Sequence, residues 1–83
     1  MVESKKYYGW KNYETWNVAL WLNNEGLVDY FNSEEDLEDI RSYRAFIKYI
    51  GLDRQATGDG VNYLDYRLDY KSLTDMLLEV RRA

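Results

Sequence analysis

The chain has 83 residues, no cysteine and no histidine, and its fifteen acidic and eleven basic side chains give a formal net charge of −4. A chain of this length forms one small domain, residues 1–83, which hides only somewhat over ~60% of its unfolded surface. The absence of cysteine excludes disulfides, thiol nucleophiles and cysteine metal sites, and the absence of histidine removes the commonest general base and metal ligand. We therefore expect no enzymatic activity and no cofactor.

The first predicted helix covers Tyr13 to Glu25. Asn12 is a good N-cap, most of the helix circumference after it is apolar, and Gly26 can end the helix in a left-handed conformation. A helix this apolar is expected to be central. We therefore interpret Trp16 as packed on the last helix and Trp21 as packed on the second, with a surface anchor for a partner as the alternative role of either indole.

Asn17 interrupts this apolar segment. A buried amide must be paired, so we interpret Asn17 as bonded to a loop or strand backbone, with a place in a contact site as the alternative. After the helix, a further turn or two of helix is predicted by Leu27, Val28 and Phe31.

The second predicted helix runs from Glu34 to Ile50. Ser33 begins the capping-box-like stretch Ser-Glu-Glu-Asp. Apolar residues follow at spacings of three or four, at Leu37, Ile40, Tyr43, Ile47 and Ile50. Acids in the first turns and bases in the later ones suit the helix macrodipole, and Gly51 provides the stop.

A loop and an extended segment follow. Residues 53–60 contain turn formers and no apolar side chain larger than alanine, and the stretch from Asp53 to Asp65 lacks the twelfth-position glutamate of a calcium loop. No metal is predicted. The segment Val61 to Leu68 ends in alternating apolar and charged residues, as in a strand with one buried face, and its best pairing partner is the N-terminal stretch from Lys6 to Trp10.

The last predicted helix begins at Asp69 or Ser72, either of which can cap it. One stripe of this helix is formed by Leu73, Met76, Leu77 and Val80. The fold class predicted from the whole pattern is mostly α, a small three-helix domain to which a short two-stranded ribbon adds a minor β part.

Two runs of the chain resemble a known family. The first is Asn-Tyr-Glu-Thr-Trp-Asn-Val-Ala-Leu-Trp-Leu at residues 12–22, and the second is GDGVNYLDYRLDYKSLTDMLLEV at residues 58–80. They are similar to the opening and closing segments of a family of small uncharacterised domains found mainly in bacteriophages and other mobile elements. The resemblance implies such an origin, and it brings no established activity, cofactor or catalytic residue.

The region from Glu25 to Asp39 carries seven acids and no base. Some of these charges are explained by the start of the second helix, where the dipole favours acids. The alternative is a row of carboxylates that imitates nucleic-acid phosphates or complements a basic groove on a partner. The acids that would steer the approach to such a partner are Glu34, Glu35, Glu38 and Asp39.

Nine tyrosines are more than one small core can hide, so several are expected at the surface as contact residues. The candidates are Tyr7, Tyr8, Tyr63 and Tyr66. They could supply contact area to a partner protein, and a homodimer formed through them is an alternative that the sequence leaves open.

The function that we predict is that of a non-catalytic binding protein of a phage or mobile element, which docks on a host or phage protein and modulates it as an inhibitor or nucleic-acid mimic. No run of ~18 apolar residues and no signal peptide occurs, so we expect no membrane association and a place in the host-cell cytoplasm. The rival function is a single-stranded nucleic-acid-binding module that uses Lys5, Lys6, Tyr7, Tyr8, Trp10 and Lys11. The net negative charge disfavours nucleic acid as a partner.

Overall fold

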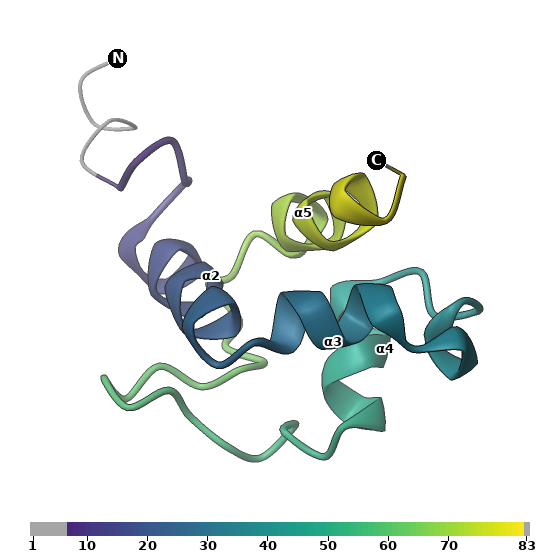
Figure 1. The fold of residues 1–83 in the computed structure, drawn as a ribbon. Helices are drawn as coiled ribbons and strands as arrows, with labels where there is room; N and C mark the ends of the chain where they lie inside the picture. Colours follow the sequence, from purple (N-terminus) through teal and green to yellow (C-terminus); the bar gives the residue numbers. More distant parts are fainter. Residues whose placement is uncertain (1–6, 83) are drawn as a thin grey trace.

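The computed structural model describes residues 7–82, which form four α-helices and one 3₁₀ helix (Figure 1). In chain order these are α2 (Tyr13–Asn24), α3 (Leu27–Ser33), η1 (Glu35–Leu37), α4 (Tyr43–Tyr49) and α5 (Tyr70–Arg82). Between the described residues, the only β pairing is an isolated antiparallel bridge from Ala56 to Asn62. The predicted mostly α class is confirmed.

Helix α2 presents three faces, as follows from 100° of rotation per residue. The core face is formed by Thr15, Val18, Ala19 and Leu22. A second face lies under the connection that leads from α4 to α5, and it carries Glu14, Asn17 and Trp21. The third face is turned towards solvent and carries Tyr13, Trp16 and Leu20.

The interpretation of both tryptophans as core residues is wrong. Trp16 and Trp21 are each only partly buried, because they flank the core face of α2 on opposite sides instead of lying on it. Trp16 packs against two tyrosine rings from its own end of the chain, and Trp21 lies on the connection before α5. The core instead uses smaller side chains from α2, together with Phe31, Tyr43 and Phe46.

The predicted long second helix is broken. Ser33 is the last residue of α3 and donates its hydroxyl to the Tyr30 carbonyl, so it does not cap a new helix. The new N-cap is Ser42, whose hydroxyl accepts from the Ala45 amide. The Tyr43 amide donates to the Thr74 hydroxyl of α5. In a continuous helix this amide would donate to a backbone carbonyl of the same helix, and the bond to α5 would be lost.

The predicted two-stranded ribbon is also wrong. In the segment from Val61 to Leu68, the Asn62 side chain accepts from the Leu64 amide and the Asp65 side chain accepts from the Arg67 amide. These local bonds fold the segment into successive turns, because they compete with the extended ladder of a strand. The proposed partner also fails to form a strand, since residues 7–9 make a turn and Lys6 lies outside the described residues.

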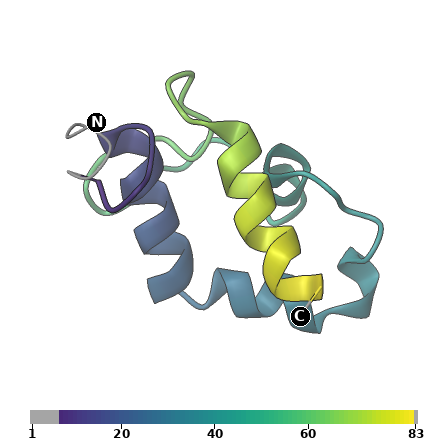
Figure 2. The ribbon, with the colours of Figure 1, turned by 90° about the horizontal axis from the view of Figure 1, so that it is seen from above.

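Helix α5 begins where Asp69 accepts from the amide and the hydroxyl of Ser72, so Asp69 is the cap. Leu73 and Leu77 enter the core, and α5 packs against α3 and α4. Figure 2 shows that α2 and α5 begin on the same side of the molecule and run in a similar direction, with α3 crossing beneath their far ends. The shared starting side brings the caps of the two helices together.

Candidate functional site

The start of α2 is bonded to the start of α5. The Asn12 side chain accepts from the Thr15 amide as an N-cap and donates to the Arg67 carbonyl at 2.7 Å. The Thr15 hydroxyl donates to the Asn12 side chain and accepts from the Asp69 amide at 2.9 Å. Asn12 and Thr15 therefore satisfy backbone groups of both helices at once.

The middle of α2 is bonded to the turn at residues 57–61. Asn17 is fully buried, its amide nitrogen donating to the Asp59 carboxylate at 2.8 Å and its oxygen accepting from the Thr57 hydroxyl at 2.7 Å. The Trp21 indole nitrogen donates to the same Asp59 oxygen at 3.0 Å. Gly58 lies under the Trp21 ring, where a Cβ atom would come within 2.4 Å of the indole.

Charged groups complete this contact. Arg67 forms ion pairs with Glu14 and Asp65, both at 2.9 Å. The donors Trp21 and Asn17 hold the pKa of Asp59 below its usual value. The bond from Arg67 likewise lowers the pKa of Asp65, and the bond from Ser72 lowers that of Asp69.

We name this contact the polar seam, formed by Asn12, Glu14, Thr15, Asn17 and Trp21 of the α2 region with Thr57, Asp59, Arg67 and Asp69. Its polar groups satisfy one another, which is what a structural contact requires. The structural role predicted for Asn17 is confirmed in part: it bonds to a loop, but its partners are the side chains of Thr57 and Asp59 and not the backbone. Asn12 and Asp69 were predicted as helix caps, but the contact between the two helix starts was missed. The signal that could have revealed part of it is the spacing of positions 14, 17 and 21, which places three residues with polar groups on one side of the helix.

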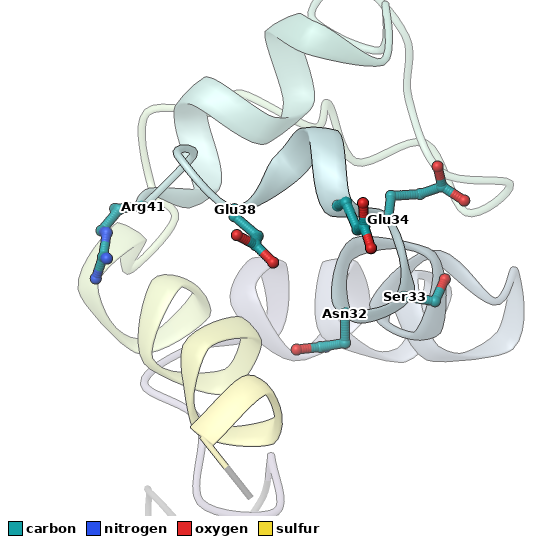
Figure 3. Close-up of a pocket in the computed structure, with 6 residues that line it drawn as sticks. Asn32, Ser33, Glu34, Glu38 and Arg41 are labelled. Carbon is teal, nitrogen blue, oxygen red and sulfur yellow. The ribbon is translucent and has the colours of Figure 1, made fainter.

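The predicted acids lie around a hollow at the opposite end of the molecule from the N-terminal turn (Figure 1). We call this the acidic hollow; its volume is about 460 Å³ and its lining is Asn32, Ser33, Glu34, Glu35, Glu38 and Arg41. Figure 3 shows Glu38 between Glu34 and Arg41, which stands at one end. The structure thus brings three of the four predicted acids into one hollow, and the fourth, Asp39, is exposed next to Glu38.

The backbone holds these acids in place through one apolar anchor. Glu34 is extended at the end of α3, η1 follows, and the side chain of Leu37 is fully buried. The Leu37 amide donates to the Glu34 carbonyl at 3.1 Å. Across the described part of the chain, no lysine or arginine forms an ion pair with Glu34, Glu35 or Asp39.

Asn32 is one of the residues that line the acidic hollow. Its amide nitrogen donates to the Val28 carbonyl at 2.7 Å, and its Oδ1 is sealed from solvent without a partner in the part of the chain that is described. A sealed acceptor without a bond costs roughly 1–3 kcal/mol.

The predicted contact tyrosines are not gathered on one surface. Tyr8 is 80% exposed and Tyr66 is 89% exposed, whereas Tyr7 is half-buried. The expectation that Tyr63 lies on the surface is wrong, since it is only 5% exposed. Its carbonyl accepts from the buried Tyr43 hydroxyl and its amide donates to Gln55, and these bonds draw the residue into the core.

An aromatic cluster covers the solvent face of α2. The Tyr8 ring stacks on Trp16 with centroids 6.1 Å apart, and Tyr13 contacts Trp16 at 5.7 Å. Tyr8 has a φ of 56°, which is uncommon for a residue with a side chain. Exposed Lys11 lies in the same turn region, while Lys5 and Lys6 of the predicted basic arm lie outside the described residues.

Among residues 7–82, no group of three or more histidine, cysteine, aspartate or glutamate side chains is arranged to hold a metal ion. None of the helices in that range is both long and apolar enough to cross a membrane.

Comparison with known proteins identifies the family. The pattern of the family described as "Family of unknown function (DUF7249)" matches residues 3–83, so the chain belongs to this family. No curated protein and no solved structure matches the chain significantly. The predicted membership in an uncharacterised family is confirmed, while the phage or mobile-element origin and the status of residues 12–22 as a family signature stay predictions.

Proposed function

We propose that this member of a family of unknown function is a non-catalytic acidic binding protein of a phage or mobile element. It docks on a host or phage protein with a basic surface and modulates that protein, as an anti-defence inhibitor or a nucleic-acid mimic. The observation that carries the proposal is the presentation of Glu34, Glu35 and Asp39 at an exposed end of the molecule without ion pairs to described lysines or arginines.

The charge of these acids is available to a partner. A charge that is already paired within its own chain contributes less to steering, because the two fields cancel. Arg67, by contrast, is neutralised by Glu14 and Asp65 within the polar seam. Exposed like charges raise the association rate with a basic surface and make it fall as salt rises.

The backbone around the acids supports the same function. Leu37 anchors the segment, so the acids are held on a short defined turn and not on a free tail. Pre-ordering of a contact segment reduces the entropy lost on binding. The acidic hollow adds a concave surface that a lysine or arginine of the partner can enter.

The test is a pull-down from a lysate of the organism that carries the chain, with three baits. The first is the wild type, and the second is a triple variant with Glu34→Gln, Glu35→Gln and Asp39→Asn. The third removes three charges from other exposed positions, through Asp29→Asn, Asp53→Asn and Glu79→Gln. We expect a basic protein that the wild type and the third bait retain, that the second loses, and that elutes as salt rises.

Two outcomes would contradict the proposal. One is that the second and third baits retain the same proteins in the same amounts, which would make the position of the acids irrelevant. The other is that the wild type retains no basic protein at low salt. The circular dichroism spectrum of each bait checks that the comparison is between folded proteins.

The rival function, single-strand nucleic-acid binding, is favoured by one observation. The exposed Tyr8 ring stacks on Trp16, and Lys11 is exposed a few residues along the chain; bases stack on platforms of this kind. Fluorescence anisotropy of a labelled thymidine oligonucleotide tests it at low micromolar protein and moderate salt. We expect no binding; binding that Tyr8→Ser weakens and the acidic triple variant strengthens would replace our proposal with the rival.

Self-association is a separate prediction for the same tyrosines. Since Tyr63 is buried and Tyr7 is half-buried, Tyr8 and Tyr66 are the ones that remain available for a homodimer contact. Light scattering at high micromolar concentration decides the matter. A monomeric mass would remove the homodimer, and a dimeric mass that Tyr8→Ser or Tyr66→Ser returns to a monomer would establish it.

A further inference from the structure

A second hollow lies between the end of α2 and the connection that follows α4. We call it the aromatic hollow; its volume is about 430 Å³, and its lining includes Trp21, Glu25, Leu27, Leu52, Gly58 and Tyr63. It shares no lining residue with the acidic hollow. Its size falls in the usual range of ligand pockets, roughly 300–1,000 Å³.

The indole of Trp21 forms a fixed wall of the aromatic hollow. Its Nε1 donates to Asp59 at 3.0 Å, and its six-membered ring lies against Gly58. The ring is therefore held in one orientation, and one part of it remains partly exposed on the side of the hollow. The negative face of an indole is the preferred aromatic surface for a cation.

The hydroxyl of Tyr63 forms no hydrogen bond with any residue that the structure describes. The bonds of Tyr63 to described residues are made by its backbone, to Tyr43 and Gln55. Tyr63 is 5% exposed. Tyr63 is among the residues that line the aromatic hollow, where its hydroxyl can accept a hydrogen bond from a ligand.

Glu25 supplies the charge. It is the C-cap residue of α2, its side chain is exposed, and none of the described lysines or arginines forms an ion pair with it. Burial raises the pKa of Tyr63, and the nearby Glu25 carboxylate raises it further, which places the two oxygens within reach of one electrostatic field. Among the described residues, no lysine or arginine lines the aromatic hollow.

We propose that the aromatic hollow binds an arginine side chain presented by a partner protein. The apolar stem of the arginine lies against Leu27 and Leu52, the planar guanidinium stacks on the Trp21 ring, and its N–H groups donate to the Glu25 carboxylate and the Tyr63 hydroxyl. Arginine suits the hollow better than lysine because its flat group can stack and donate several bonds at once.

This inference goes beyond the proposed function. The acidic hollow steers by exposed charge and requires no particular side chain, whereas the aromatic hollow reads the shape and charge of one residue. The two can fail separately, since Glu25→Gln leaves the acidic hollow intact and Glu34→Gln leaves the aromatic hollow intact.

The experiment is a titration followed by the indole N–H signals in a nitrogen–proton NMR spectrum. The probe is Nα-acetyl-arginine N-methylamide, and the neutral citrulline analogue of the same shape is the matched ligand control. Trp21→Phe assigns the Trp21 signal, and Trp10 and Trp16 serve as internal references. We expect a saturable shift of the Trp21 signal with the arginine probe at millimolar concentration and none with the citrulline analogue.

Variants then assign the roles. Glu25→Gln is expected to raise the dissociation constant by about fivefold, as for loss of a partly exposed ion pair. Tyr63→Phe removes only a hydroxyl that has no described protein partner, so we expect unchanged stability and a dissociation constant raised by about threefold. Glu34→Gln removes the same charge from the acidic hollow and is expected to leave the titration unchanged.

Three results of the titrations with the blocked probes would overturn the inference. They are no saturable shift of the Trp21 signal, equal shifts with the arginine and citrulline probes, or an unchanged dissociation constant in Glu25→Gln. Free L-arginine forms the last arm, since tighter binding of the free amino acid than of the blocked probe would show a metabolite site and not a docking surface. A loss of stability in Tyr63→Phe would equally contradict the assignment of its hydroxyl to a ligand.

Discussion

The polar seam and the acidic hollow both consist of charged and amide side chains, yet they use them in opposite ways. In the polar seam, Asn17 bonds to both Thr57 and Asp59, and Arg67 is held between two carboxylates. At the acidic hollow, Glu34 and Glu35 are exposed without ion pairs to described bases, and Asn32 Oδ1 has no hydrogen-bond partner among the residues that the structure describes.

The polar seam and the acidic hollow therefore contribute differently to stability and to binding. Polar groups that satisfy each other lower the energy of the fold and have little left for a partner. Polar groups that face water add little to stability and can exchange water for a partner. The most distinctive stretch of the sequence, residues 12–22, therefore serves the fold, and the proposed binding surfaces lie mainly outside it, apart from the Trp21 wall of the aromatic hollow.

The largest effect is expected at Asn17. Asn17→Ala removes both bonds and leaves the buried Thr57 hydroxyl without its acceptor, so the free energy of unfolding should fall by about 3 kcal/mol. Urea unfolding followed by tryptophan fluorescence measures the change. The matched control is Asn24→Ala, the same substitution at an exposed position of α2, which should change stability by no more than about 0.5 kcal/mol. Equal losses of stability in Asn17→Ala and Asn24→Ala would contradict the structural role of the polar seam.

A smaller effect is expected at Gly58. Gly58→Ala places a Cβ against the Trp21 ring, and overpacking of this kind destabilises by about 1–3 kcal/mol. The cause can be isolated by a double-mutant cycle with Trp21→Phe, whose smaller ring leaves room for the methyl group. If the alanine destabilises the Trp21→Phe background as much as the wild type, the clash with the indole is not the reason.

The polar seam also predicts a pH dependence. The pKa of Asp59 is lower in the folded chain than in the unfolded one, so the folded chain binds fewer protons and Asp59 stabilises it above the unfolded pKa. This stability is lost as pH falls through the folded pKa, below about pH 4. The difference in the free energy of unfolding between wild type and Asp59→Asn should therefore become smaller in acid. The same difference for the control Asp53→Asn should change less. A constant difference down to pH 2 would contradict the assigned bonds.

The smallest effect on stability is expected at the acidic hollow. We consider the triple variant Glu34→Gln, Glu35→Gln and Asp39→Asn. Its free energy of unfolding should differ from that of the wild type by no more than about 0.5 kcal/mol per substitution, because exposed acids without ion pairs contribute little to the folded state. Thermal unfolding of the wild type and the triple variant measures this difference in stability. A loss as large as that of Asn17→Ala would show that the acids hold the fold, and would remove the separation between the two regions.

The helices at the two ends of the chain could be predicted because their signals are local. Asn12 caps α2, Gly26 follows it with a φ of 75°, and Asp69 caps α5, all as the sequence indicates. The division of the second helix could not be predicted. It depends on the Ser33 hydroxyl bonding backward to Tyr30 and on the Tyr43 amide bonding to Thr74, which is 31 residues away.

The candidate sites also differ in how much of each could be predicted from local signals in the sequence. The grouping of Glu34, Glu35 and Glu38 follows from their closeness in the chain, and the sequence could predict it. The burial of Tyr63 and the partial exposure of Trp16 depend on contacts from distant residues, and hydrophobicity gives the opposite expectation for both. The aromatic hollow joins residues 21–27 to residues 51–63, a juxtaposition that no local pattern in the sequence reveals.

Native-state hydrogen exchange tests most directly the claim that the polar seam holds the fold while the acidic segment is free to bind. The amides of Thr57, Tyr63 and Asp69 donate to Val61, Gln55 and Thr15, and we expect them to exchange only through global unfolding. The amides of Glu35 and Asp36 should exchange through local opening at a much lower free energy. Exchange of the Thr57 and Asp69 amides by local opening, with Glu35 and Asp36 protected to the global value, would contradict the account.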